Sequence, residues 1–412
     1  MNFSFLSGMR VIESSAFIAA PLAGLTLAQF GADVIRVDLI GGGIDYRRLP
    51  NVPNGRSLYW TSLNKDKRSI AIDLKKPEGR ELLASLVTAP GDEGGVLLTN
   101  VGVPWLSHSK LSLLREDLIS CTIEGNADGT TAVDYTINCS TGYPSITGAG
   151  SISHPVNHPY PAWDTACAFQ AALAVTSAFH RRSATREGAE IRLALSDVAF
   201  SMLSHLGLLG EQEVLGQGRE SIGNNIYGAF GGDFETSDGE RVMVAAISSR
   251  QWKALVMACD IEEAVRRIER ETGVDLTTEE GRFSAGDAIA IALKPWFAAR
   301  PLSDINALFT QQNVCWGLYE TTKTLLERDP RVSLSNPIFE NVDVEGVGRH
   351  RVAGTPVRLA DASRGDVRPA PLLGRDTDEI LASILNLDGP AIGKLHDAGV
   401  VAGPDKDPSI KN

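Results

Sequence analysis

Asp164 stands out for possible chemistry because it is an isolated acid in front of a long apolar segment. In "PYPAWDTACAFQAALAVTSAFHRR" (159–182) it is the only charged side chain before the final two residues. A carboxylate at the start of a helix is kept ionised by the helix dipole and can act as a nucleophile. The small neighbours Ala162, Thr165 and Ala166 leave room for an acyl group. The alternative is a helix N-cap, which would contribute about 1 kcal/mol to stability.

A second candidate site is the basic stretch "NKDKRS" (64–69), which contains Lys65, Lys67 and Arg68. At the ends of parallel strands these residues would attract phosphate groups. The alternative is a solvated charged face. The whole chain carries a formal net charge of −12. Because no long basic stripe offsets this charge, we expect no nucleic-acid partner.

Two glycine-containing turns bear on nucleotide binding. The first strand-to-helix turn, "ESSAFIAAPLAG", lacks the GxGxxG fingerprint, which counts against an ordinary dehydrogenase. "GGGIDYRR" (41–48) follows a strand but is not closed by the Lys-Ser/Thr pair of a P-loop. It is either a flexible turn or a segment beside a ligand.

Metal and disulfide chemistry are not expected. His154 and His158 have a spacing that could hold a metal on a helix, but the prolines of "HPVNHPYP" exclude a regular helix. The five cysteines are scattered and contain no CxxC, which favours a reducing cytoplasm. We find neither a signal-like start nor a long apolar run, so we expect no export and no membrane span.

The elements that must position these residues alternate between strand and helix. Such alternation predicts an α/β protein with a parallel sheet. We expect a large domain from residues 1–225 and 331–412, and a smaller α+β domain at 226–330 that opens with a hairpin turning at Asp238-Gly239. The expected strands are 9–14, 32–38, 69–74, 95–100, 118–125 and 189–197, and the expected helices are 20–31, 77–87, 109–116, 164–180, 197–210, 249–258, 286–299, 302–312 and 377–387.

Several segments, in the right order, resemble the class III coenzyme A transferases. They are "GMRVIESSAFIAAPLAGLTLAQFGADVIRVD", "NKDKRSIAIDLKKPEGRELL", "LLTN", "PAWDTACAFQAALA", "LGRDTDEILASILNL" and "LHDAGVV". The resemblance covers nearly the whole chain. It implies a Rossmann-like large domain built from both chain ends, a small domain between them, and an interlocked homodimer. It also implies an acyl-CoA substrate, no cofactor beyond coenzyme A itself, and no metal.

The resemblance also assigns roles to residues. Asp164 stands at the position of the family nucleophile. For a substrate with a second carboxylate, we expect His158, Tyr160 or a nearby arginine to hold the carboxylate that is not reacting. Coenzyme A would lie along Ile18, Ala19, Ile72, Asp73, Leu74, Lys75, Asn100 and Val101.

Two departures from the family pattern limit these assignments. Formyl-CoA transferase has an arginine near the nucleotide where this chain has Leu39, so the phosphate contacts would use other residues, such as Arg36, Arg47 or Lys75. The racemases of the family have a histidine where Val133 stands, so a racemase is disfavoured.

The segments "VNHPYPAWD" (156–164) and "NNIYGAFGGDFETSDGERVMV" (224–244) narrow the resemblance. They are similar to members that move coenzyme A between the two carboxyl groups of one branched, unsaturated C4 dicarboxylic acid. In that reaction Asp164 would form an anhydride and then an aspartyl-CoA thioester. Two alternatives stay open: transfer to a separate acid, and a non-catalytic CoA-binding protein.

Overall fold

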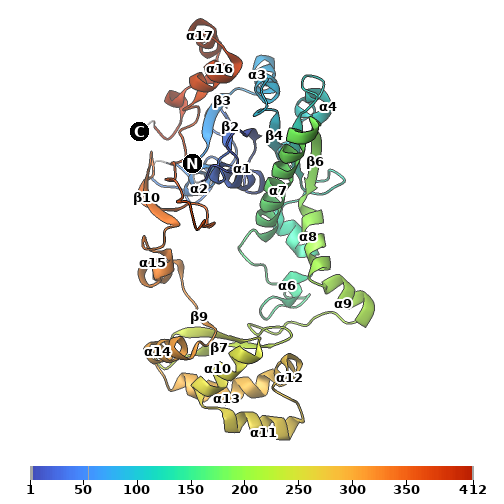
Figure 1. Cartoon of the computed structure of the whole chain (residues 1–412), viewed down its shortest axis with the longest axis vertical. Coiled ribbons are helices and arrows are strands. Elements are labelled where there is room, and N and C mark those ends of the chain that lie inside the picture. The colour runs from blue at the N-terminus through green and yellow to red at the C-terminus, as the bar shows by residue number, and fades with distance from the viewer. Residues whose placement is uncertain (1–2, 54, 411–412) are drawn as a thin grey trace. The chain divides into compact units, whose positions relative to one another are not determined.

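The computed structural model describes residues 3–53 and 55–410 and divides the chain into two compact units. Unit 1 comprises Met1–Thr141, Pro159–Leu215 and Pro330–Asn412, and unit 2 comprises Gly142–His158 and Gly216–Asp329. In unit 1 the two ends of the chain come together, because helix α16 (Thr377–Leu385) contacts strand β3 (Arg68–Ile72) (Figure 1). The two predicted domains, one from residues 1–225 and 331–412 and one from residues 226–330, stay a prediction.

A seven-stranded sheet forms the centre of unit 1, in the order β12-β3-β2-β1-β4-β5-β6. All neighbouring pairs are parallel except the pair of β12 and β3. The predicted α/β class with its parallel sheet is therefore confirmed. The remaining strands of this sheet are β1 (Arg10–Ser14), β2 (Asp33–Leu39), β4 (Val96–Thr99), β5 (Ile119–Glu124), β6 (Ala189–Ala194) and β12 (Val401–Ala402).

The central strands are buried along almost their whole length, as expected of parallel strands covered by helices. Their apolar side chains share one core cluster with residues from α3, α16 and α17. The helices of unit 1 are α1 (Ala19–Gln29), α2 (Leu58–Asn64), α3 (Pro77–Thr88), α4 (His108–Leu111), α5 (Asp134–Ser140), α7 (Ala162–Thr185), α8 (Leu195–His205), α9 (Leu208–Leu215), α16 and α17 (Gly389–Asp397). A hairpin of β10 (Phe339–Val344) and β11 (Gly348–Ala353) completes the unit.

Helices α1 and α7 contact each other, and α1 also contacts β1 and β2. Both helices are rich in buried alanines, which allow close approach. Gly24 in α1 has a specific role, because a Cβ atom there would lie 1.8 Å from Oε2 of Glu13. The helix is therefore shaped to cover a buried carboxylate at the end of β1.

Unit 2 is an antiparallel sheet with helices, in the order β7-β8-β9. The predicted hairpin is confirmed, with Gly239 in its turn at φ 80°. Phe234 and Phe297 stack in its core with ring centroids 4.4 Å apart. The elements are β7 (Phe230–Glu235), β8 (Arg241–Ala246), β9 (Trp316–Leu318), α6 (Tyr143–Ile146), α10 (Ser249–Cys259), α11 (Glu262–Thr272), α12 (Glu279–Ser284), α13 (Gly286–Ala298), α14 (Leu302–Gln312) and α15 (Thr322–Arg328).

Short elements account for most of the helices that the sequence analysis did not predict. Helices α2 and α5 have seven residues each, too few to display a helical hydrophobic period. Within the described residues, no helix combines the length and the apolar character that a membrane crossing requires.

Candidate active site

Asp164 lines a cavity of about 410 Å³ in unit 1, here called the Asp164 cavity. The residue is the third of α7, so its side chain projects from the first helical turn. The other parts of the wall are residues 17–19 after β1, Arg48, Tyr59, Asn100, residues 123–125 and 132–135, and Leu195.

The first turn of α7 is capped by a residue distant in sequence. Helix α7 begins at Ala162 and its N-cap position is Pro161, so the alternative that Asp164 is the N-cap is wrong. Proline has no polar side chain to offer as a cap. Instead, one carboxylate oxygen of Asp134 accepts the backbone N–H groups of Trp163 at 2.7 Å and of Asp164 at 3.1 Å.

Asp134 is itself buried, with 2% of its surface exposed. Its second oxygen, Oδ1, is buried and accepts no hydrogen bond from the described residues. A buried carboxylate without full hydrogen bonding is costly. Asp134 therefore places a poorly solvated negative charge beside Asp164.

The pKa of Asp164 is raised to about 7, first by burial and then by repulsion from the Asp134 carboxylate. The Arg48 guanidinium opposes this rise. We expected the helix dipole to keep Asp164 ionised. With a pKa of about 7 the carboxyl group is not fully ionised at neutral pH, so that expectation is corrected. The Asp164 carboxylate has no hydrogen bond or ion pair with the described residues, which leaves it available to react.

The loop between β1 and α1 forms one wall of the cavity in a strained conformation. Phe17 has φ 65°, which is rare for a residue with a side chain. Its N–H donates to Asp45 at 2.9 Å. Asn100 accepts the Ala16 N–H at 2.9 Å and donates to the Ala16 carbonyl at 2.7 Å. Of the residues predicted to bind coenzyme A, Ile18, Ala19 and Asn100 lie here.

A buried ion network supports this loop from below. Arg36 is 3% exposed, and its guanidinium lies 3.1 Å from Glu13 and 3.4 Å from Asp45. Lys67 Nζ lies 2.8 Å from Glu13, and burial lowers the pKa of Lys67 to about 8. The network therefore fixes Asp45, which in turn holds Phe17.

Burial and ion pairing correct three expectations. Lys67 is neither a phosphate-binding group nor part of a solvated face, because it is buried against Glu13. Arg68 is not free to bind a phosphate, because it pairs with Asp33, its Nε donating to Oδ1 at 2.9 Å. Arg36 is too deeply buried to contact a phosphate. The sequence shows that these residues are basic, but it does not show which acids face them in the fold.

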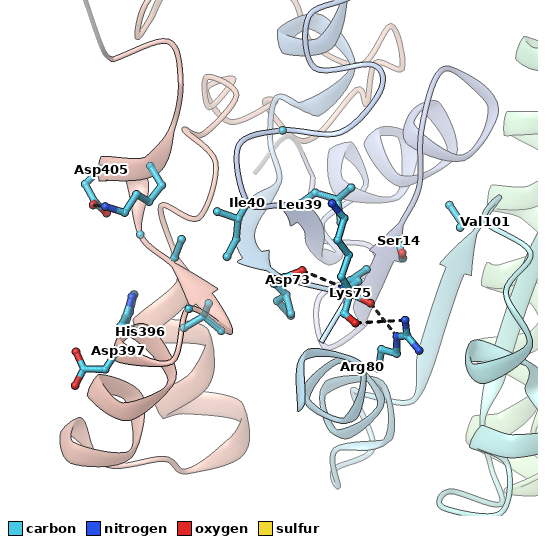
Figure 2. A pocket seen from close by; sticks show the side chains of 18 of the residues that line it. Ser14, Leu39, Ile40, Asp73, Lys75, Arg80, Val101, His396, Asp397 and Asp405 are labelled. Atoms are coloured by element: carbon cyan, nitrogen blue, oxygen red, sulfur yellow. Dashed lines mark hydrogen bonds and ion pairs between the residues drawn. The ribbon is translucent and has the colours of Figure 1, made fainter. Parts of the chain in front are cut away.

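A second cavity in unit 1, of about 940 Å³, contains the other residues predicted to bind coenzyme A (Figure 2). Here this is called the large cavity. It is lined by Ile72, Asp73, Leu74, Lys75 and Val101. Asn100 lines the Asp164 cavity and the next residue lines the large cavity, so the two cavities approach each other at the end of β4.

The C-terminal segment supplies the opposite side of the large cavity, where Figure 2 shows His396, Asp397 and Asp405. No role was expected for these residues, although "LHDAGVV" (395–401) is among the segments of the family resemblance. Leu39, which replaces the arginine of formyl-CoA transferase, also lines this cavity.

The remaining predicted residues lie elsewhere. Tyr160 is 59% exposed in the loop before α7 and is outside the lining of both cavities. His158 belongs to unit 2, so its contact with substrate stays a prediction. Arg47 is exposed and lines neither cavity. His154 and His158 lie in non-helical chain, and the described residues contain no cluster of His, Cys, Asp and Glu suited to a metal.

Arg48, Tyr59 and Asp134 line the Asp164 cavity and were not predicted as site residues. Arg48 belongs to "GGGIDYRR", the stretch for which a place beside a ligand was one alternative. Asp134 follows Val133, the position that disfavours a racemase, and had no expected role of its own. No signal in the sequence connects it with Asp164, thirty positions later.

Comparisons with known proteins identify the family and the fold of the chain. The model of CoA-transferase family III matches residues 6–377. The chain is 45% identical over 403 residues to the 2-methylfumaryl-CoA isomerase of Chloroflexus aurantiacus, covering 97% of this chain and 98% of that protein. It is 25% identical to a formyl-CoA:oxalate CoA-transferase of Rhodopseudomonas palustris, with 97% and 98% covered. A crystal structure of a CAIB/BAIF family protein from Brucella suis shares the fold, with TM-score 0.74 at 24% identity over 93% of this chain and 100% of that chain.

Proposed function

The chain belongs to CoA-transferase family III, and from this premise we propose that it isomerises 2-methylfumaryl-CoA by intramolecular transfer of coenzyme A. In this reaction coenzyme A moves from the C1 to the C4 carboxyl group of mesaconate, which gives 3-methylfumaryl-CoA. The observation that carries the proposal is the 45% identity, over almost the full length of both chains, to an isomerase of that name.

Asp164 is the proposed nucleophile. Its carboxylate attacks the C1 thioester carbonyl, the C–S bond breaks, and coenzyme A leaves as a thiolate from a mixed anhydride. The thiolate attacks the aspartyl carbonyl of the anhydride, which releases mesaconate and leaves an aspartyl-CoA thioester. The C4 carboxylate then attacks this thioester, and the same two steps in reverse give the C4 thioester and free Asp164. Covalent catalysis thus divides one difficult transfer into easier steps without net proton uptake.

The first turn of α7 does not supply the donors that stabilise the oxyanions of these steps. The N–H groups of Trp163 and Asp164 already donate to Asp134, and the N–H of Ala162 donates to the Tyr160 carbonyl at 2.9 Å. The function of this turn is therefore to hold Asp164 in place. We expect the oxyanion donors to come from other walls of the Asp164 cavity.

Coenzyme A is proposed to occupy both cavities of unit 1. Its nucleotide fits the large cavity, where Lys75 supplies a positive charge, and its pantetheine arm passes Val101 and Asn100 to reach Asp164. The substrate brings its own coenzyme A, so we expect no other cofactor and no metal.

The experiment that tests the proposed function supplies unlabelled 2-methylfumaryl-CoA together with excess isotope-labelled free mesaconate. An intramolecular enzyme keeps the diacid bound between the two half-reactions, so the C4 thioester should be essentially unlabelled by mass spectrometry. Label that enters the product in proportion to the free pool would instead establish an intermolecular transferase.

We also propose an interlocked homodimer in the cytoplasm. Exposed apolar side chains on α7 and α9 support a partner surface, among them Phe169 at 52%, Leu173 at 62% and Leu215 at 67% exposed. Interlocked subunits could not separate without unfolding. Sedimentation at low protein concentration should therefore give only dimer, and a stable folded monomer would contradict the proposal.

A further inference from the structure

The substrate carries a second carboxylate into a cavity that is already acidic. Glu124, Asp134 and Asp164 all line the Asp164 cavity. Glu124 is neutralised by Arg192, with nitrogen–oxygen distances of 2.8 and 2.9 Å, but the two aspartates have no such partner. A dicarboxylate bound here therefore needs a positive charge to offset the repulsion.

Arg48 is the only Lys, Arg or His among the described residues that line this cavity. Its guanidinium carbon lies 5.5 Å from the centre of the Phe17 ring and 5.2 Å from that of Tyr59. Contacts with aromatic faces restrict the guanidinium while leaving its N–H groups free to donate. Within the described part of the chain, these N–H groups donate to no acceptor and form no ion pair.

Tyr59 adds a second unused donor. Its hydroxyl group is buried and has no hydrogen-bond partner among the described residues. Burial raises the pKa of Tyr59 to about 12, so the hydroxyl group keeps its proton at any working pH. A buried hydroxyl without a partner, beside an unpaired guanidinium, is a site prepared for an acceptor that arrives with the ligand.

We propose that Arg48 and Tyr59 bind the substrate carboxylate that is not bonded to coenzyme A. A guanidinium presents paired N–H groups that match a carboxylate, and the Tyr59 hydroxyl can donate to the same group. This inference rests on the proposed function, because it specifies how the same site selects a dicarboxylic thioester.

The reaction sequence gives this subsite a second task. After the aspartyl-CoA thioester forms, the free diacid must present its other carboxylate to Asp164. Arg48 and Tyr59 then hold the carboxylate that has just been released. The subsite thus accepts either end of the molecule in turn, and it keeps the dianion in the cavity while the diacid turns round.

The test compares two thioesters that differ only in the second carboxylate. One is 2-methylfumaryl-CoA, and the other is (E)-2-methylbut-2-enoyl-CoA, in which a methyl group replaces that carboxylate. For the monoacid, the readout is exchange of isotope-labelled free acid into its thioester, which needs Asp164 but no second carboxylate. We expect Arg48→Met to lower kcat/KM for 2-methylfumaryl-CoA about 100-fold. Exchange of the monoacid should change less than about threefold.

Arg47→Met is the matched control, because Arg47 is the adjacent, exposed arginine and lines neither cavity. It should behave as the wild type with both substrates. Arg48→Lys should recover part of the loss, since an ammonium group keeps the charge but not the paired geometry. Tyr59→Phe should lower kcat/KM for the diacid about tenfold. Free mesaconate should inhibit the monoacid exchange of the wild type, and this inhibition should weaken in Arg48→Met.

Equal losses for the two thioesters in Arg48→Met would overturn the inference, because Arg48 would then act on Asp164 or on the fold. Unchanged kcat/KM for the diacid would overturn it as well. A different result would refute the proposed function itself: the wild type would not isomerise 2-methylfumaryl-CoA. In that case inhibition of the monoacid exchange by free mesaconate still measures the subsite directly.

Discussion

The carboxylate of Asp134 accepts the backbone N–H of Asp164 at 3.1 Å, so one acid holds in place the helical turn that carries another. The two residues are thirty positions apart and meet because α5 lies against α7. Asp134 stabilises the start of α7 as a cap. It also raises the pKa of Asp164 by repulsion. A more basic carboxylate is a better nucleophile, but a smaller fraction of it is ionised at neutral pH.

The activity should therefore depend on pH through the ionisation of Asp164. Its pKa is raised to about 7, and only the carboxylate form can attack the thioester. We expect kcat/KM for 2-methylfumaryl-CoA to rise with pH and to level off above about pH 7. A pH–rate profile that is flat from pH 5 to pH 9 is incompatible with the assigned pKa.

Asp134→Asn should shift this profile to lower pH. The amide oxygen can still accept N–H bonds from the start of α7, but the negative charge that repels the Asp164 carboxylate is removed. Asp134→Ala removes the acceptor as well and should lower the free energy of unfolding by about 1–2 kcal/mol. Thermal melts and pH–rate profiles of both variants separate the two effects. An Asn variant with an unshifted profile would show that Asp134 is only a cap.

Asp164 should also make folding stability depend on pH. Its folded-state pKa of about 7 lies above the ordinary value of 3.8, so the folded state binds the proton more tightly than the unfolded state. This contribution to stability is fully present below pH 3.8 and is lost as pH rises through about 7. The side chain of Asp164→Asn cannot ionise. We therefore expect the Tm of this variant, relative to that of the wild type, to be higher at pH 8 than at pH 5. An equal difference in Tm at both pH values would contradict this linkage.

The nucleophile assignment has its own test. Asp164→Ala should fold normally and lose at least roughly 10⁴-fold in kcat, because no other group can form the covalent intermediate. Wild-type enzyme mixed with 2-methylfumaryl-CoA and quenched rapidly should carry a coenzyme A adduct on the peptide that contains Asp164. A folded Ala variant with near-normal turnover, or an adduct on another residue, would refute the assignment.

The sequence alone predicts those features of the fold and the site that depend on a short stretch of residues. The parallel strands and the long helix α7 follow from hydrophobic periodicity, and the isolated charge of Asp164 is visible in a short window. Contacts between distant segments are not local. Glu13 and Lys67 form a buried pair across 54 positions, which explains why a basic cluster was taken for a solvated or phosphate-binding one. The role proposed for Arg48 likewise depends on contacts with Phe17 and Tyr59, which only the folded chain brings beside it.

The position of Lys75 gives a prediction about coenzyme A itself. Its side chain lines the large cavity, and its ammonium group forms no ion pair with the described residues. The lining also contains the acids Asp73, Asp397 and Asp405 and two further cations, Arg80 and Lys406. Lys406 is paired with Asp405 at 3.2 Å and Arg80 donates to backbone carbonyls, so Lys75 is the cation most available to a phosphate. Lys75→Ala should raise KM for 2-methylfumaryl-CoA roughly tenfold with kcat nearly unchanged, since the contact is the same in the ground state and the transition state.

Lys110→Ala is the matched control for this variant, because Lys110 is an exposed lysine on α4 that lines neither cavity. Raising the salt concentration should weaken binding to the wild type more than binding to Lys75→Ala, as one charge–charge contact is missing from the variant. Repeating the assay with the 3′-dephospho thioester identifies the phosphate. If Lys75 binds the 3′-phosphate, removal of that phosphate abolishes the difference in KM between the wild type and the variant. If the difference persists, the contact is to the pyrophosphate. A Lys75→Ala variant with the KM of the wild type at low salt would show that Lys75 does not contact a phosphate of coenzyme A, which would leave Arg80 and Lys406 of the same cavity as its cations.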